Sequence, residues 1–165
     1  MDSFSIPPHP EEINAQNILI RLVDSIKFRF QLAILDLTIE DYDFKINPTG
    51  KSLGELLVHI YKLQATTLSA FHPDHLYPPN GPIESVTDDT ILILNSIRLK
   101  LINIHELSDF NKVTIQTLSF WNLINGPLAD TLTHIGQINM IKRALDKPVR
   151  KSSMLKGIFK SEEII

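Results

Sequence analysis

Apolar side chains recur at steps of three and four residues in four separate stretches of the chain, and this spacing constrains the fold more than any other feature. The stripe of the first stretch consists of Ile18, Leu19, Leu22, Val23, Ile26, Phe30, Ala33, Ile34 and Leu37. The spacing predicts helices over about residues 12–37, 53–71, 87–107 and 128–146. Each helix would carry one apolar face that it cannot bury alone, so we expect an all-α four-helix bundle.

Local signals place some helix ends and leave one open. Ser52 and Glu55 have the spacing of a capping box, in which each side chain bonds the backbone N–H of the other residue. Gly126-Pro127 marks either a kink in a longer last helix or the start of that helix, because proline lacks an N–H. Residues 109–118 alternate and include β-branched side chains, which allows a short strand. The connections between the helices are long, which favours crossover connections.

The composition bounds the classes of function. The 165 residues fit a single domain, with the bundle over about 12–146 and a C-terminal tail over 147–165. The formal net charge of −3 argues against a nucleic-acid surface. The chain has no cysteine, so nitrogen and oxygen would have to hold any metal. It has neither an apolar run of the roughly 18 residues that span a membrane nor a signal-peptide pattern, so we expect a cytoplasmic protein.

Two histidines lie at the edges of the apolar stripes. His59 lies beside Leu56 and Leu63 in the second predicted helix, and His134 lies in the last, one turn after Asp130. Two imidazoles and one carboxylate from facing helices can supply three ligands to a divalent ion and leave positions open for water or substrate. The alternative is that both histidines are half-buried, hydrogen-bonded residues and that Asp130 is a first-turn acid.

Three more residues are candidates for a pocket around this group. Gln137 lies one turn after His134 and could orient a metal-bound water or a ligand, or instead fill a polar helix–helix contact. Trp121 and Asn125 precede Asp130 and could line the mouth of a pocket, with the hydrophobic core as the alternative for Trp121. In the basic tail, we expect four apolar side chains to pack on the bundle: Met154, Leu155, Ile158 and Phe159.

The segments that carry the proposed ligands resemble a known family. Ser52-Leu-Gly-Glu-Leu-Leu-Val-His59-Ile is similar to the second-helix motif of the DinB-like (DinB/YfiT-like) family, four-helix proteins that include the bacillithiol-transferase-like group. Asp130-Thr-Leu-Thr-His134-Ile-Gly-Gln137-Ile resembles the last-helix motif of that family. The resemblance extends over about residues 12–158.

This resemblance implies a divalent metal, nickel or zinc most often, held by one histidine of the second helix and a His-x-x-x-His pair of the last. His59 and His134 match two of these positions, and Asp130 stands at the third. A carboxylate there changes the charge of the site and weakens its preference for softer ions. The departure also fits a member of the family that has lost its metal.

Two classes of function follow. One is a divalent-metal-dependent enzyme of hydrolase or thiol-transferase type acting on a small molecule, with any thiol supplied by a cosubstrate because the chain has no cysteine. The other is a non-catalytic bundle that binds a ligand or a partner and has lost the metal site. The resemblance, together with the apolar run Ile91-Leu-Ile-Leu94, also predicts a homodimer.

Overall fold

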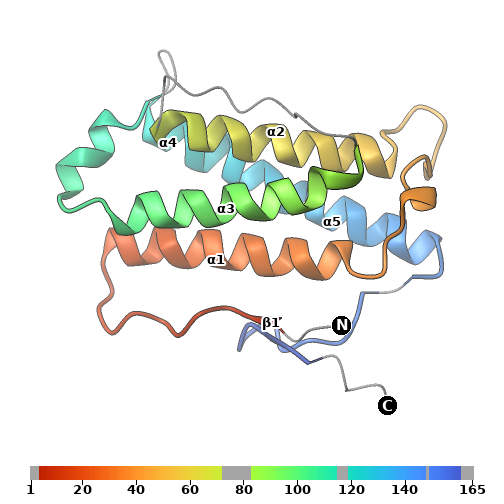
Figure 1. Cartoon of the computed structure of the whole chain (residues 1–165), viewed down its shortest axis with the longest axis horizontal. Helices are drawn as coiled ribbons and strands as arrows, with labels where there is room; N and C mark the ends of the chain where they lie inside the picture. The colour runs from red at the N-terminus through yellow and green to blue at the C-terminus, as the bar shows by residue number, and fades with distance from the viewer. Residues whose placement is uncertain (1–3, 72–82, 115–118, 148, 161–165) are drawn as a thin grey trace.

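The computed structural model describes residues 4–71, 83–114, 119–147 and 149–160, and over these residues the fold is a bundle of four long helices (Figure 1). The long helices are α1 (Ala15–Ile34), α2 (Leu53–Phe71), α3 (Val86–Ile102) and α5 (Ala129–Ala144). The short elements are β1 (Phe4–Ser5), η1 (Ile39–Asp41), η2 (Ile83–Ser85), η3 (Leu107–Lys112), α4 (Phe120–Leu123), the π-helix η4 (Ile124–Leu128) and β2 (Ile158–Phe159). The predicted all-α four-helix bundle is confirmed. Within the described part of the chain, no helix combines the length and the apolar character needed to cross a membrane.

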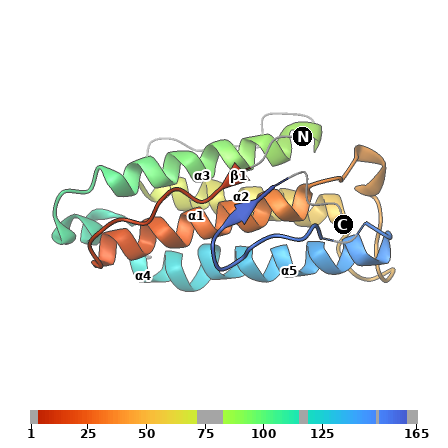
Figure 2. The same cartoon turned by 90° about the horizontal axis from the view of Figure 1, so that it is seen from below.

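The four long helices form a ring in which α3 packs between α1 and α2, and α5 packs against α1 and α2 on the other side (Figures 1 and 2). Helices α1 and α5 run in one direction, and α2 and α3 run in the other (Figure 1). Because α2 and α3 are parallel, the chain has to cross from one end of the bundle to the other between them. The predicted crossover connection is therefore confirmed at this position.

The apolar stripes meet in the interior of the ring. Each long helix contributes side chains that are at most 1% exposed, and these are Val23, Ile26, Phe30 and Ala33 of α1, Leu53, Leu57 and Ile60 of α2, Leu94 and Ile97 of α3, and Ile138 of α5. Burial of apolar surface on this scale is the main term that stabilises such a fold. The periodic pattern of the sequence therefore locates the core.

Two charged contacts join α1 to its neighbours. Asp24 is 3% exposed and accepts a hydrogen bond from Arg98 Nε of α3 at 2.8 Å. The fully buried ammonium of Lys142 on α5 donates to the carbonyl oxygen of Leu35, at the end of α1. The last carbonyl groups of a helix lack intrahelical partners, so a cation there supplies both a hydrogen bond and a favourable charge.

The ends of α2 agree with the sequence, and those of α1 lie inside the predicted range. The capping box is formed: Ser52 N–H donates to Glu55 Oε2 at 2.6 Å, and Glu55 N–H donates to Ser52 Oγ at 3.2 Å. Helix α1 begins at Ala15 because Asn14 caps it, with Asn17 N–H donating to Asn14 Oδ1 at 2.9 Å. It ends at Ile34, and Asp36 then takes the left-handed conformation with φ of 66°, which breaks the helical path.

Helix α3 ends at Ile102, five residues before the predicted limit at Leu107. The side-chain amide of Gln16 on α1 donates to the carbonyl oxygens of Leu101 at 2.7 Å and Ile104 at 2.6 Å. These bonds satisfy carbonyl groups that a longer α3 would have used itself. Residues 107–112 form the 3-10 helix η3, so a strand is absent over 109–114; residues 115–118 of the predicted strand lie outside the described residues.

The last helix is already formed before Gly126-Pro127, so this dipeptide lies inside a longer helix, at a π-turn, and does not start it. Helical structure begins at Phe120, and the π-turn of η4 carries Pro127 into α5. A π-turn inserts one extra residue, which accommodates a proline that would otherwise leave an α-helical hydrogen bond unmade. It also rotates the residues after it relative to those before it.

The two ends of the described chain pair with each other along α1 (Figure 2). Strands β1 and β2 are antiparallel, with Phe4 opposite Phe159. Phe159 is 4% exposed and packs with Phe28 and Leu32 on the outer face of α1. The prediction that the tail packs on the bundle is thus confirmed for Phe159. It is wrong for Leu155, which is fully exposed in the turn before β2, and Met154 and Ile158 are also exposed, at 40% and 38%.

The apolar run in α3 that led to the homodimer prediction is divided between core and surface. Ile93 and Leu94 are buried, whereas Leu92 is 62% exposed and Leu99, two turns later, is 57% exposed. The outward apolar positions lie on the face of α3 turned away from the bundle. The homodimer stays a prediction.

Candidate metal centre

Helices α2 and α5 pack against each other in opposite directions and hold the residues that the sequence singled out. His59 lies in the second turn of α2, and Asp130 and His134 lie in the first two turns of α5. The buried Gln64 of α2 donates to Thr131 Oγ1 of α5 at 2.6 Å. This hydrogen bond fixes the register of the two helices one residue away from Asp130.

The π-turn decides which face of α5 points to α2. It ends at Leu128, two residues before Asp130. Thr131 Oγ1 donates to the carbonyl oxygen of Pro127 at 2.8 Å, so the same hydroxyl that accepts from Gln64 also satisfies an acceptor inside the π-turn. π-Turns are common at functional sites because they reorient side chains within a continuous helix. Here the turn precedes the two α5 residues of the candidate site.

The three candidate ligands converge. Asp130 Oδ2 lies 3.5 Å from His59 Nε2 and 3.3 Å from His134 Nε2. The two imidazole rings meet edge to face, with centroids 4.6 Å apart and an interplanar angle of 86°. The three donor atoms all lie within 4.8 Å of one another. The sequence prediction that these residues come together from two facing helices is borne out by this geometry.

These separations are close to those of a metal site. Ligands at about 2.1 Å from a tetrahedral ion stand about 3.4 Å apart. The two contacts of Asp130, at 3.3 and 3.5 Å, already have this length, so only the two histidine nitrogens would need to approach each other. The side chains are 33%, 44% and 12% exposed for His59, Asp130 and His134. The group is therefore half-buried and reachable from solvent through Asp130 and His59.

Gln137 holds the His134 ring in a defined orientation. His134 Nδ1–H donates to Gln137 Oε1 at 2.8 Å, within the same helix. With the proton on Nδ1, the lone pair of Nε2 points to Asp130 and is free for an ion. The sequence predicted that Gln137 orients a metal-bound water or a ligand, or fills a helix–helix contact. In the structure its side chain is exposed and its hydrogen bond orients the His134 ring instead.

The surroundings favour the neutral form of His59. Burial lowers the pKa of His59, and the positive charge of Lys51 and the neighbouring ring of His134 lower the pKa further, while the carboxylate of Asp130 opposes them. A histidine must be neutral to ligate a metal. The lowered pKa therefore favours the form of His59 that can bind an ion at neutral pH.

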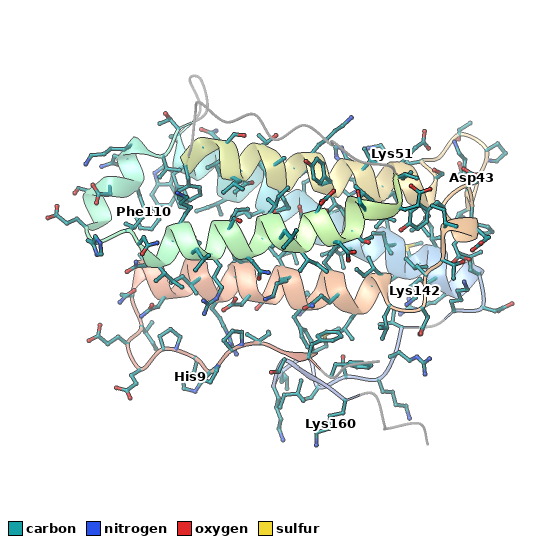
Figure 3. The ribbon with its side chains drawn as sticks, in the orientation of Figure 1. His9, Asp43, Lys51, Phe110, Lys142 and Lys160 are labelled. Carbon is teal, nitrogen blue, oxygen red and sulfur yellow. The ribbon has the colours of Figure 1, made fainter. Side chains whose placement is uncertain are left out.

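Two hollows flank the group. One, of about 430 Å³, is lined by His134 and Gln137 together with Ile46, Asn47, Gly50, Lys51, Leu56, Met140 and Ile141. The other, of about 620 Å³, is lined by His59 with Asp43, Lys45, Lys51, Ser52, Gly54, Glu55, Val58, Lys62 and Ile83. We call them the His134 pocket and the His59 cleft. Lys51 lines both, and it lies with Asp43 at the end of the bundle where α2 begins (Figure 3).

The other two pocket candidates from the sequence lie apart from this group. Trp121 is 73% exposed, so its assignment to the core is wrong. It lines a separate apolar hollow of about 460 Å³ with Phe110 and Phe120, and Phe110 lies at the opposite end of the bundle from Lys51 (Figure 3). Asn125 is exposed within η4 and lines neither the His134 pocket nor the His59 cleft.

Sequence reasoning missed Lys51, Ile46 and Met140 as residues beside the group. Lys51 directly precedes the cap of α2, so the capping box was a signal that could have placed it near His59. Ile46 belongs to the irregular connection before α2, where the helical period gives no information. Only the packing of that connection against α5 brings it near His134.

Comparisons with family models, with curated proteins and with solved structures find no match to the chain. The resemblance to the DinB-like family therefore rests on the two motifs alone.

Proposed function

We propose that His59, Asp130 and His134 hold one divalent metal ion and that the protein is a metal-dependent enzyme acting on a small molecule, of hydrolase or thiol-transferase type. The observation that carries this proposal is the convergence of the three donor atoms within 4.8 Å from two separate helices. Two imidazoles and one carboxylate suit zinc or nickel, and they leave further coordination positions open. The resemblance to DinB-like proteins supports the same assignment.

An ion bound there would polarise a water molecule or the thiol of a cosubstrate for hydrolysis or transfer. The chain's own residues prepare the site for it. The lowered pKa of His59 favours the neutral ring, and Gln137 holds Nε2 of His134 toward the centre. Asp130 supplies one negative charge, which offsets part of the charge of a divalent ion.

A second candidate function follows from the contacts of Asp130. Its carboxylate already lies within ion-pair distance of both imidazoles, so the group can be satisfied without an ion whenever one histidine is protonated. In that case the bundle would be a non-catalytic module that binds a ligand or partner. Metal binding distinguishes the two functions.

Calorimetric titration of zinc, nickel and manganese into the metal-free protein tests the proposal. We expect one ion per chain for zinc or nickel, no stoichiometric binding to His59→Ala or His134→Ala, and unchanged binding to the control His105→Ala, whose side chain is exposed. Asp130→His should raise the affinity for zinc and nickel relative to manganese, because imidazole suits these ions better than carboxylate does. A wild-type protein that takes up none of the three ions would favour the binding module.

A further inference from the structure

The His134 pocket has an apolar wall that is open to solvent. Ile46 and Met140 line it, although they are 53% and 57% exposed. Leu56 and Ile141 complete the aliphatic lining. Its volume of about 430 Å³ lies in the range of pockets that bind small molecules, about 300–1,000 Å³. Exposed apolar side chains gathered around a hollow next to ligating residues indicate a place for the apolar part of a ligand.

The polar lining of the same pocket is neutral or positive. It comprises Asn47, Lys51, His134 and Gln137, and no carboxylate is among the described residues that line it. Lys51 also lines the His59 cleft, and its charge is among the causes that lower the pKa of His59. Because Lys51 lines both hollows that flank the three candidate ligands, it borders the candidate metal centre.

The His59 cleft has a different charge balance. Asp43 and Glu55 contribute carboxylates to it, and Glu55 Oε2 forms an ion pair with Lys45 Nζ at 3.3 Å. Its three lysines, Lys45, Lys51 and Lys62, therefore stand among two carboxylates on that side. In the His134 pocket, by contrast, no carboxylate of the described lining residues opposes Lys51, so an anion there meets no acidic side chain of the lining.

We propose that the His134 pocket binds an apolar monocarboxylate, with the aliphatic body against Ile46 and Met140 and the carboxylate between Lys51 and the metal centre. This assignment names a substrate class for the proposed function and rests on it. A divalent ion with the single carboxylate of Asp130 leaves the centre positive, and Lys51 adds to that charge, so a ligand with one negative charge is favoured over a neutral one. The aliphatic wall favours an extended apolar body over a small anion.

The proposal has two parts, recognition of the carboxylate and recognition of the aliphatic chain. Hexanoate has both groups, and each of two comparison ligands lacks one of them. Calorimetry of the zinc-loaded protein with hexanoate, hexanol and acetate separates the contribution of the charge from that of the chain. We expect hexanoate to bind at least tenfold more tightly than hexanol, which lacks the charge, and than acetate, which lacks the chain. Equal affinity for hexanoate and hexanol, or for hexanoate and acetate, overturns the assignment.

Substitutions with matched controls locate the site. Lys51→Met should weaken hexanoate about threefold to tenfold and leave hexanol unchanged, whereas Lys62→Met, in the His59 cleft alone, should change neither. Met140→Asp should weaken hexanoate more than tenfold by placing a like charge in the pocket, and the exposed Leu92→Asp on α3 should not. All four side chains are exposed, so the fold is retained. Equal effects of a substitution and its control contradict the proposal.

Zinc titration of the same variants separates this assignment from the proposed function. If zinc binds and hexanoate shows neither the charge nor the chain preference, the substrate class is wrong and the metal centre stands. If zinc does not bind while hexanoate still binds in a manner that depends on Lys51, the pocket assignment stands and the metal centre is wrong.

Discussion

Replacing Gln137 with leucine removes the hydrogen bond that orients His134 and leaves all three proposed ligands in place. Gln137 Oε1 accepts from Nδ1 of His134 at 2.8 Å. Only 12% of the His134 side chain is exposed, so water can replace this bond only in part. Without it the ring can rotate, and the proton can move to the nitrogen that faces Asp130.

The expected loss follows from the role of such outer hydrogen bonds. Removing the partner of a ligating histidine typically reduces metal affinity by about 10- to 100-fold, which corresponds to about 1.4–2.7 kcal/mol. The effect on folding should be smaller, at most about 1 kcal/mol, because Gln137 is exposed and the bond is a single hydrogen bond. Leucine and glutamine also have similar helix propensities. Metal affinity should therefore change more than stability.

The assay is zinc titration by calorimetry, with thermal unfolding of the metal-free protein measured in parallel. Gln137→Glu serves as the rescue, because its carboxylate can accept the same N–H and should keep or raise the affinity. Gln31→Leu on α1, which carries none of the proposed ligands, is the matched control and should behave as the wild type. An unchanged zinc affinity in Gln137→Leu would refute the orienting role.

Three further results are expected from contacts elsewhere in the bundle. Asp24→Ala leaves the guanidinium of Arg98 without its buried partner, and urea unfolding should show a loss of about 3 kcal/mol; a loss below about 1 kcal/mol would contradict this. The hydrogen bond from Arg150 lowers the pKa of Asp36, so this pair stabilises the fold above the ordinary carboxyl pKa of about 3.9 and loses that effect as the pH falls through the lower folded value. The stability difference between wild type and Arg150→Met, followed by thermal unfolding, should therefore shrink toward acid pH, and a constant difference would argue against the pair. Phe159→Ala removes a ring that is 4% exposed and should lower the free energy of unfolding, measured with denaturant, by about 3 kcal/mol. An unchanged free energy of unfolding would show that the paired ends do not stabilise the bundle.

Local patterns were sufficient for α2, whose first turn is closed by its own capping residues. The bounds of α2 are those predicted, because the capping box of Ser52 and Glu55 needs only neighbours in the sequence. The end of α3 was predicted five residues too late. There the apolar period continues, but Gln16, from a different helix, bonds the carbonyl groups that end it. A contact between residues so far apart leaves no local signal.

Side chains at helix surfaces also divide into those that the helical period places correctly and those that it does not. His59 and His134 were placed at the edges of their stripes from the helical period, and the structure brings them together with Asp130. Trp121 was predicted to lie in the core or at the mouth of this site, but it is exposed and lines a separate hollow with Phe110. Phe110 lies at the other end of the bundle from Lys51 (Figure 3). The π-turn between Trp121 and Asp130 changes the rotation of the helix, so a constant period does not carry over from one residue to the other.

The sequence by itself determined the class of the fold, the existence of four apolar stripes and the positions of the three candidate ligands at the edges of two of those stripes, because each depends on a period or a spacing within one helix. The tertiary structure alone decided the ring order of the helices, the register of α2 against α5 that Gln64 and Thr131 fix, and the pocket beside His134. These features depend on contacts between segments distant in the chain. The free energy of such contacts comes from shape and burial in three dimensions, which a one-dimensional pattern does not specify.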